Sequence, residues 1–237
     1  MSALAHVSGS FVREQIRTPL TVVLLVAIPA FFVLIFASVL GEFSKALGGT
    51  LASRSATAIS AGWAAAFLSG TLAFFQVSSS QGADRRLATA GLGAPRVALS
   101  RITAALLLGL AVSAVAFLTL LLRSGIGHPL HAAVAIFAFA AIYIGIGALI
   151  GAFISGLLEG SLLVMLVFSL DAFSGPQMTS TGGIGSFTPT RQAANLLVAA
   201  GGGHGSPSAD WAGVAAVMLG ALAVALGAFW LAARTKA

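Results

Sequence analysis

Residues able to bind and hydrolyse nucleotide are sparse in this chain. A phosphate-binding P-loop places a lysine directly after a glycine and before a serine or threonine, so that backbone and side chain together neutralise the phosphates. The two lysines of the chain, Lys45 and Lys236, do not follow a glycine. The sequence therefore excludes ATP hydrolysis by this route. Any nucleotide that powers the protein must be bound by a partner chain.

Metal and thiol chemistry are also poorly supported. The chain has no cysteine, which excludes disulfides, thiolate zinc ligands and a cysteine nucleophile. His128 and His131, in the stretch HPLH, offer two imidazole nitrogens, but no neighbouring carboxylate completes a zinc site. Asp210 precedes an apolar run, where it suits a helix N-cap. We expect no catalytic group, no metal and no cofactor bound by this chain itself.

Two carboxylates stand out by their positions. Asp171 interrupts the apolar run LVFSLDAFSG, and a carboxylate at membrane depth indicates a substrate path or a proton relay by default. It also lies near the predicted outer end of that run, where water reaches it, and there we favour local capping or an interface position. Glu159 lies in the turn SGLLEG. It is either a solvated turn residue or a contact for a cytoplasmic partner.

The composition indicates a bilayer as the solvent of these residues. Hydrophobic residues make up 58% of the chain, charged residues 8%, and the mean hydropathy is +1.03. A soluble domain has about 25% charged residues, so this chain has too few to cover its own surface. The formal net charge is +6, but its basic residues are spread among the predicted loops. Membrane topology explains this charge better than nucleic-acid binding, which we do not expect.

We expect an all-α integral membrane protein with six transmembrane helices. A helix needs about 20 apolar residues to cross the hydrocarbon core. The first apolar run is longer than the hydrophobic region of a signal peptide, about 7–15 residues, so it is retained as a span. Pro29, inside that run, predicts a kink because it lacks an N–H. The expected spans are residues 19–41, 56–79, 100–122, 131–154, 157–174 and 210–232.

Loop charge predicts that both termini are cytoplasmic, because basic residues concentrate on that side. Residues 9–18 are predicted to form a short helix that lies in the cytoplasmic interface of the membrane. The alternative is that they form a frayed tail. After the fifth span the chain is rich in Gly, Pro, Ser and Thr, and Pro189 suits the start of a weaker helix over 189–200. This helix is expected to be re-entrant or extracellular. The expected inside residues are Arg13, Arg17, Arg85, Arg86, Arg96, Arg101, Arg234 and Lys236, and the expected outside residues are Lys45, Arg54, Arg123 and Arg191.

The segment between the second and third spans, residues 80–97, is predicted to be a cytoplasmic loop. We expect the second span to end near Val77 and a short helix to begin near Asp84. The sequence GLGAP then ends that helix, since glycine and proline disfavour its continuation. A purely topological role would account for the arginines of the loop. It would not account for the length of the loop or for its turn residues.

With these features, nearly the whole chain resembles the membrane subunits of ABC-2 type transporters. The resemblance is based on FVREQIRTP before the first span, the six spans, DRRLATAGLGAPRVALSR between spans two and three, and FTPTRQAANLLVAA before the last span. It implies a permease that pairs with a second copy or a homologous permease. It also implies two cytoplasmic ATPase subunits that bind ATP and Mg²⁺. The loop over 80–97 would be the coupling helix that sits in the ATPase.

The resemblance also implies the site residues and the activity. The expected ATPase contacts are Arg13, Glu14, Arg17, Asp84, Arg85, Arg86, Leu87, Gly91, Leu92, Gly93, Pro95, Arg96 and Glu159. Phe67, Phe74, Phe168, Asp171 and Phe173 are expected along a substrate path. We expect a multi-pass protein of a prokaryotic plasma (inner) membrane that exports a hydrophobic or amphipathic, drug-like or lipid substrate.

Two alternatives remain open from the sequence. The first is an ion-coupled secondary transporter that uses Asp171 as its coupling carboxylate. Such carriers often contain internal repeats, and we find none between residues 1–120 and 121–237. The second is a membrane assembly subunit that transports nothing.

Overall fold

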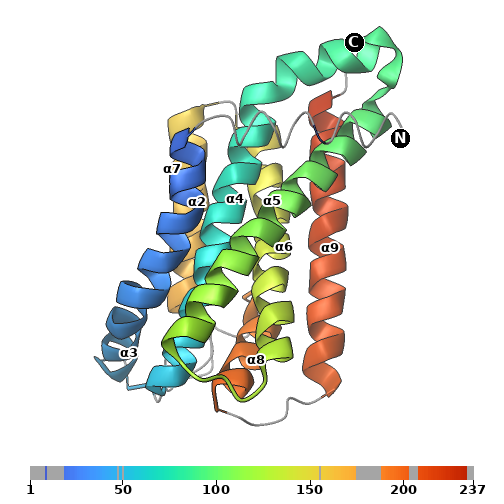
Figure 1. Cartoon of the computed structure of the whole chain (residues 1–237). Helices are drawn as coiled ribbons and strands as arrows, with labels where there is room; N and C mark the ends of the chain where they lie inside the picture. Colours follow the sequence, from blue (N-terminus) through green and yellow to red (C-terminus); the bar gives the residue numbers. More distant parts are fainter. Residues whose placement is uncertain are drawn as a thin grey trace.

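The computed structural model describes residues 9, 19–46, 48–49, 51–154, 156–174, 188–202 and 208–233, and every regular element among them is helical (Figure 1). Apart from Gly9, the expected interfacial helix lies outside the described residues, and with it Arg13, Glu14 and Arg17. Residues 175–187 of the expected cap and the basic residues Arg234 and Lys236 also lie outside them.

Five helices among the described residues are long and apolar enough to cross a membrane. They are Val23–Ala46, Ser53–Leu92, Ala94–Arg123, Pro129–Phe153 and Asp210–Ala233. The predicted fifth span corresponds to α7, Leu157–Phe173, which has 17 residues and is shorter than these five. The chain is thus a helical bundle of the multi-pass membrane type, as the composition predicted.

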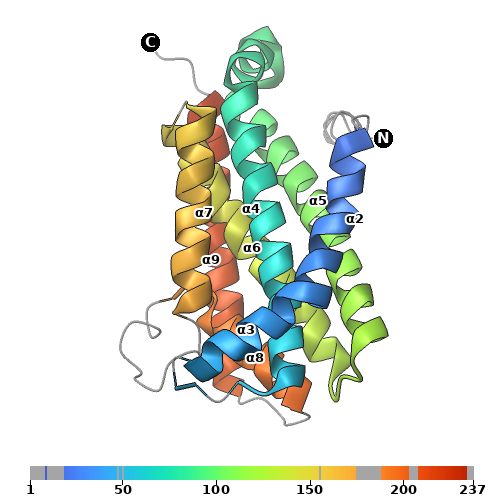
Figure 2. The same ribbon diagram turned by 90° about the vertical axis from the view of Figure 1, so that its left-hand side faces the viewer.

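The first membrane helix is bent, and the bend has a local cause. It consists of α2 (Pro19–Phe31), a π-helical turn η1 (Phe32–Phe36) and α3 (Ala37–Ala46), and Figure 2 shows the change of direction between α2 and α3. Pro29 removes one helical hydrogen bond just before the π turn. Arg123 donates from Nη1 to the Val33 carbonyl at 2.6 Å and also to the Leu34 carbonyl. The predicted kink is present, but the helix extends beyond the expected end at residue 41.

The second membrane helix is much longer than predicted. It comprises α4 (Ser53–Leu87) and a π-helical turn η2 (Ala88–Leu92), so the expected end near Val77 is wrong. Ser78, Ser79 and Ser80 donate their hydroxyls to carbonyls four residues earlier. Such bonds keep the backbone helical while bending it. The last turns cross the upper end of the bundle in Figure 1 and are seen end-on in Figure 2.

Helices α4 and α6 (Pro129–Phe153) form the centre of the bundle. The helices around them include α5 (Ala94–Arg123), α7, α8 (Arg191–Gly202) and α9 (Ser208–Ala233). The most apolar stretches of α4 and α6 are 78% and 72% buried, against 22% for the first and last membrane helices. A Cβ atom on Gly147 would lie 2.0 Å from the Gly70 carbonyl oxygen. The two central backbones are therefore in direct contact, as small residues permit in membrane helices.

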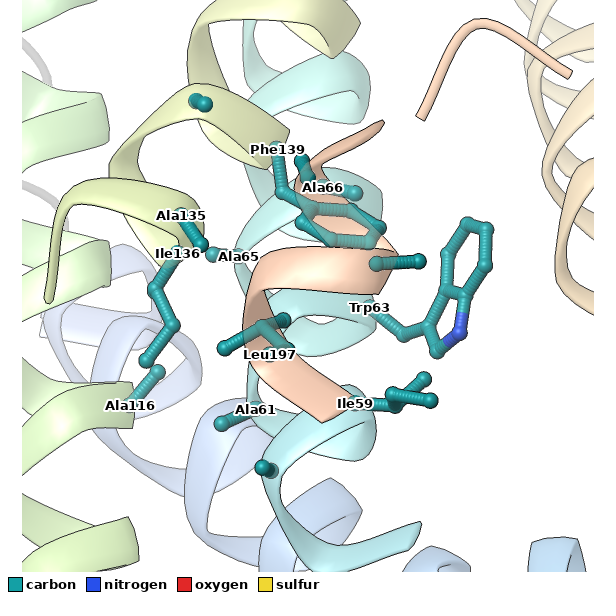
Figure 3. Packing of buried hydrophobic residues seen from close by; sticks show 14 of the residues in the cluster. Ile59, Ala61, Trp63, Ala65, Ala66, Ala116, Ala135, Ile136, Phe139 and Leu197 are labelled. Atoms are coloured by element: carbon teal, nitrogen blue, oxygen red, sulfur yellow. The ribbon is translucent and has the colours of Figure 1, made fainter. Parts of the chain in front are cut away.

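Helix α8 closes the lower end of this centre. Figure 3 shows Leu197 of α8 among side chains of α4 and α6. A Cβ on Gly62 would lie 2.6 Å from Leu197 Cδ1 and 2.8 Å from Phe139 Cδ2, so the missing side chain makes room for both. The sequence predicted a helix over 189–200, and α8 occupies nearly that range.

The outer surface of the bundle is aliphatic on several helices. Val23 of α2, Leu118 of α5 and Leu219 of α9 are 59%, 58% and 64% exposed. Exposed aliphatic side chains on so many helices are what a bilayer would cover.

Candidate functional site

The charged residues of the expected coupling loop lie at the end of the bundle where α4 ends and α5 begins. We call residues 78–92 the α4 tail. Its two faces differ: Ala83, Arg86 and Ala90 are exposed, while Asp84 is buried. Residues three, four and seven apart share one face of a helix, so the exposed side forms a single strip. The α4 tail therefore presents Arg86 outward and turns Asp84 toward the bundle.

Asp84 is paired with Arg101 of α5. Arg101 donates from Nη2 to Asp84 Oδ1 at 2.7 Å and from Nε to both carboxylate oxygens at 3.0 and 3.1 Å. Ser80 Oγ donates to Oδ2 at 3.1 Å. The two side chains are only 6% and 2% exposed, and a bidentate pair of this geometry is strong and directional. Asp84 is thus held inside the protein, with its carboxylate bonded to Arg101 and Ser80 and turned away from the surface that an ATPase could reach.

Two further bonds attach the α4 tail to other helices. Gln81 Nε2 donates to the Gly151 carbonyl near the end of α6 at 3.1 Å. Arg85 Nε donates to the Ala232 carbonyl near the end of α9 at 3.4 Å. The last carbonyls of a helix lack partners within it, so Arg85 satisfies one of them. The α4 tail is consequently fixed to α5, α6 and α9 together.

The turn that ends the α4 tail requires its glycines. Gly91 has φ +106° and Gly93 has φ +75°, values that side-chain-bearing residues rarely adopt. The Gly93 N–H donates to the Ala88 carbonyl at 3.2 Å, and Pro95 occupies the first turn of α5, where a missing N–H is tolerated. Of the predicted contacts here, Gly91, Pro95 and Arg96 are exposed, and Leu87, Leu92 and Gly93 are half-buried.

Glu159 lies at the same end of the bundle, in the first turn of α7. It is exposed, and a Cβ on Gly156 would fall 1.4 Å from its Oε2. The carboxylate therefore folds back over the start of its helix, where negative charge is favourable. Both roles considered for Glu159, a turn residue and a partner contact, agree with this position.

Asp171 lies near the opposite end and is 4% exposed. Tyr143 of α6 donates its hydroxyl to Oδ2 at 2.9 Å, and Thr190 Oγ1, just before α8, lies 3.0 Å from both oxygens. The carboxylate thus joins α6, α7 and the start of α8, and both of its oxygens have hydrogen-bond donors. This geometry favours the local structural role over an open ion path.

The residues expected along a substrate path do not all come together. Phe67 and Phe168 have ring centroids 5.1 Å apart, and Phe168 also contacts Trp63 at 5.5 Å. Phe74 instead packs at Gly160, where an added Cβ would lie 2.2 Å from its ring. Phe173 contacts Phe43 of α3, with ring centroids 4.8 Å apart. The sequence reasoning missed Trp63 and Tyr143; the latter, as the only tyrosine of the chain, was a usable signal.

The two histidines of HPLH face each other without forming a metal site. His128 and His131 stack with ring centroids 4.9 Å apart. Within the described parts of the chain, no group of three His, Asp or Glu residues is placed to hold a metal ion.

These features define the class of protein: a multi-pass helical bundle whose second membrane helix ends in a tail braced across one end of the bundle. No family model matches the chain, and no curated protein matches it.

Proposed function

We propose that this chain is the membrane subunit of an ATP-driven exporter of the ABC-2 type, with the α4 tail as its coupling element. The observation that supports the proposal is the difference between the two faces of this tail. Its outer face carries Arg86 and is exposed. Its inner face is bonded to α5, α6 and α9. A partner that moves the outer face would move three membrane helices with it.

The sequence supports a separate ATPase as that partner. The chain has no Gly-Lys-Ser/Thr motif, so the energy of ATP must arrive from another chain that binds ATP and Mg²⁺. Two such subunits would act on a pair of permeases. The pair contains either two copies of this chain or one copy and a homologue. Glu159, exposed at the same end, would be a second contact.

The proposal includes a sixth membrane crossing by α7. Its 17 residues extend for about 26 Å, close to the hydrocarbon thickness of about 30 Å. With six crossings both chain ends lie on the side of the α4 tail, which would be the cytoplasmic side of a prokaryotic plasma membrane. The helix α8 would then close the outer end of the bundle as a cap.

The substrate class follows from the side chains available to it. Of the predicted path residues, Phe67 and Phe168 lie side by side, and the surrounding helices present aliphatic residues. A hydrophobic or amphipathic substrate, drug-like or lipid, fits these surfaces best. The hydrogen bonds of Asp171 leave the alternative of an ion-coupled carrier with less support.

Co-purification with an ABC-type ATPase tests the proposal, and the first candidate to try is any ATPase with a Walker A motif whose gene adjoins that of this chain. We expect Arg86→Glu to abolish association and stimulation of the ATPase, because it reverses the charge at the centre of the outer face. Arg54→Glu is the matched control, since Arg54 is an exposed arginine at the start of α4. Association and stimulation equal to those of the control would refute the role of the α4 tail.

A further inference from the structure

An apolar groove lies between α5 and α9, close to the end at which α5 begins. Its volume is about 510 Å³, within the range of about 300–1,000 Å³ typical of small-molecule sites. Apart from the indole N–H of Trp230, its lining side chains are apolar. They are Pro95, Ala98 and Leu99 of α5, and Ala223, Leu226, Gly227 and Trp230 of α9. The occupant of such a groove must be apolar along most of its length.

The groove opens on a surface that the bilayer would cover. Leu99 and Leu226, on its two walls, are 44% and 40% exposed. Trp230 lies within the last turns of α9 and is half-buried, and tryptophan is enriched at the boundary between hydrocarbon and headgroups. The groove is therefore placed where an acyl chain descends from its headgroup.

A cation lies close to the groove, near the start of α5. Arg96 is exposed and is one helical turn before Leu99, so its long side chain neighbours the wall that Leu99 forms. No carboxylate of the described residues forms an ion pair with Arg96. The ion pairs among the described residues join Lys45 to Glu42 and Arg101 to Asp84. A guanidinium at this level matches the charge of an anionic lipid headgroup.

We propose that this groove binds one phospholipid with an anionic headgroup. One acyl chain lies between α5 and α9, and the headgroup lies against Arg96. Gly227 borders the open space of the groove, since a Cβ added there would meet no atom within 4 Å. The proposal goes beyond the transport function, and it depends only on the chain lying in a bilayer.

Native mass spectrometry of the full chain in detergent, titrated with phosphatidylglycerol, tests the acyl-chain site. Gly227→Leu places a branched side chain in the groove, at a position where its Cβ meets no atom within 4 Å. Gly220→Leu is the matched control, since Gly220 lies on the same helix and an added Cβ there also meets nothing within 4 Å. We expect the control to retain one bound phosphatidylglycerol like the unaltered chain, and Gly227→Leu to lose it.

The headgroup contact is tested with Arg96→Gln and the control Arg54→Gln. We expect phosphatidylglycerol binding to weaken about five-fold in Arg96→Gln alone, the factor expected for one arginine near an anionic surface. Binding of zwitterionic phosphatidylcholine should be equal in both. Equal phosphatidylglycerol occupancy in either matched pair would overturn the proposal. So would a loss of dimers in Gly227→Leu with unchanged lipid occupancy, because the groove would then hold a second copy of the chain.

Discussion

Arg101 of α5 donates three hydrogen bonds of 2.7 to 3.1 Å to Asp84 of the α4 tail, and both side chains are almost fully buried. The two residues are 17 positions apart in the chain and lie on either side of the turn at Gly91–Gly93. The pair therefore fixes the direction in which the tail leaves the bundle. It also couples the end of one membrane helix to the beginning of the next.

The first prediction concerns the stability that this pair provides. Arg101→Met leaves Asp84 as a buried charge without its cation, and breaking a buried pair in this way destabilises by about 3–5 kcal/mol. We expect a marked fall in the thermal unfolding temperature of the purified chain in detergent. The double variant Asp84→Leu with Arg101→Met should recover much of the loss, because no unpaired charge remains.

The exposed pair between Glu42 and Lys45 provides the control. Their side chains are 75% and 67% exposed, although the two charged atoms are only 2.7 Å apart. Exposed pairs contribute about 0.2–1 kcal/mol, so Glu42→Gln should hardly change the unfolding temperature. If Glu42→Gln lowered the unfolding temperature as much as Arg101→Met, burial would not be the reason why the Asp84–Arg101 pair stabilises the protein.

The second prediction concerns the contact between the two central helices. Gly147→Ala places a Cβ 2.0 Å from the Gly70 carbonyl oxygen. The atoms that it meets belong to the backbone of α4, which can move away only if the whole helix shifts. Overpacking of this kind costs about 1–3 kcal/mol, so the unfolding temperature should fall. Gly220→Ala, where the new Cβ meets nothing within 4 Å, should leave it unchanged or raise it. Equal effects of the two substitutions would show that α4 and α6 do not pack this closely.

Five of the six predicted spans correspond to helices long and apolar enough to cross a membrane, because their signal is local. Long apolar runs report directly on burial in lipid, and the kink beyond Pro29 follows from one missing N–H. The same reasoning failed at Ser78–Ser80, whose polar side chains were read as the beginning of a loop. In the structure each hydroxyl bonds to a carbonyl of its own helix. The polar side chains are satisfied internally, so the helix continues.

The environment of the charged residues could not be predicted because it depends on tertiary contacts. Asp84, Arg85 and Arg86 are neighbours in sequence, yet one is buried, one is half-buried and one is exposed. A helix places these three neighbours on different faces. Which of the faces is buried depends on how the α4 tail lies across the bundle, and the sequence does not show this. The partners of Asp171 are equally non-local, since Tyr143 is 28 positions and Thr190 19 positions away.

The third prediction separates a structural from an ion-coupling role of Asp171. Asp171→Asn replaces one accepting oxygen with an amide donor, so Tyr143 and Thr190 have to share the remaining oxygen, and the new amide N–H groups need acceptors that the carboxylate did not. An unsatisfied buried group costs about 1–3 kcal/mol, and we expect lower stability. Tyr143→Phe should destabilise in the same direction but by less. At equal amounts of folded protein in vesicles, transport by Asp171→Asn should equal that of the unaltered chain. Its complete loss would favour an ion-coupled carrier.

The fourth prediction separates docking of the ATPase from transmission of its motion. Gln81→Ala removes the bond to the Gly151 carbonyl of α6 without altering the exposed face that carries Arg86. We expect ATPase association to stay unchanged, because the docking surface is intact. Substrate moved per ATP hydrolysed in proteoliposomes should fall, because the tail is then braced to fewer helices. Thr89→Ala is the control, since its hydroxyl bonds only to carbonyls of the tail itself. If Gln81→Ala and Thr89→Ala transport with equal yield per ATP, the bond to α6 carries no motion, and transmission must pass through Asp84 and Arg85.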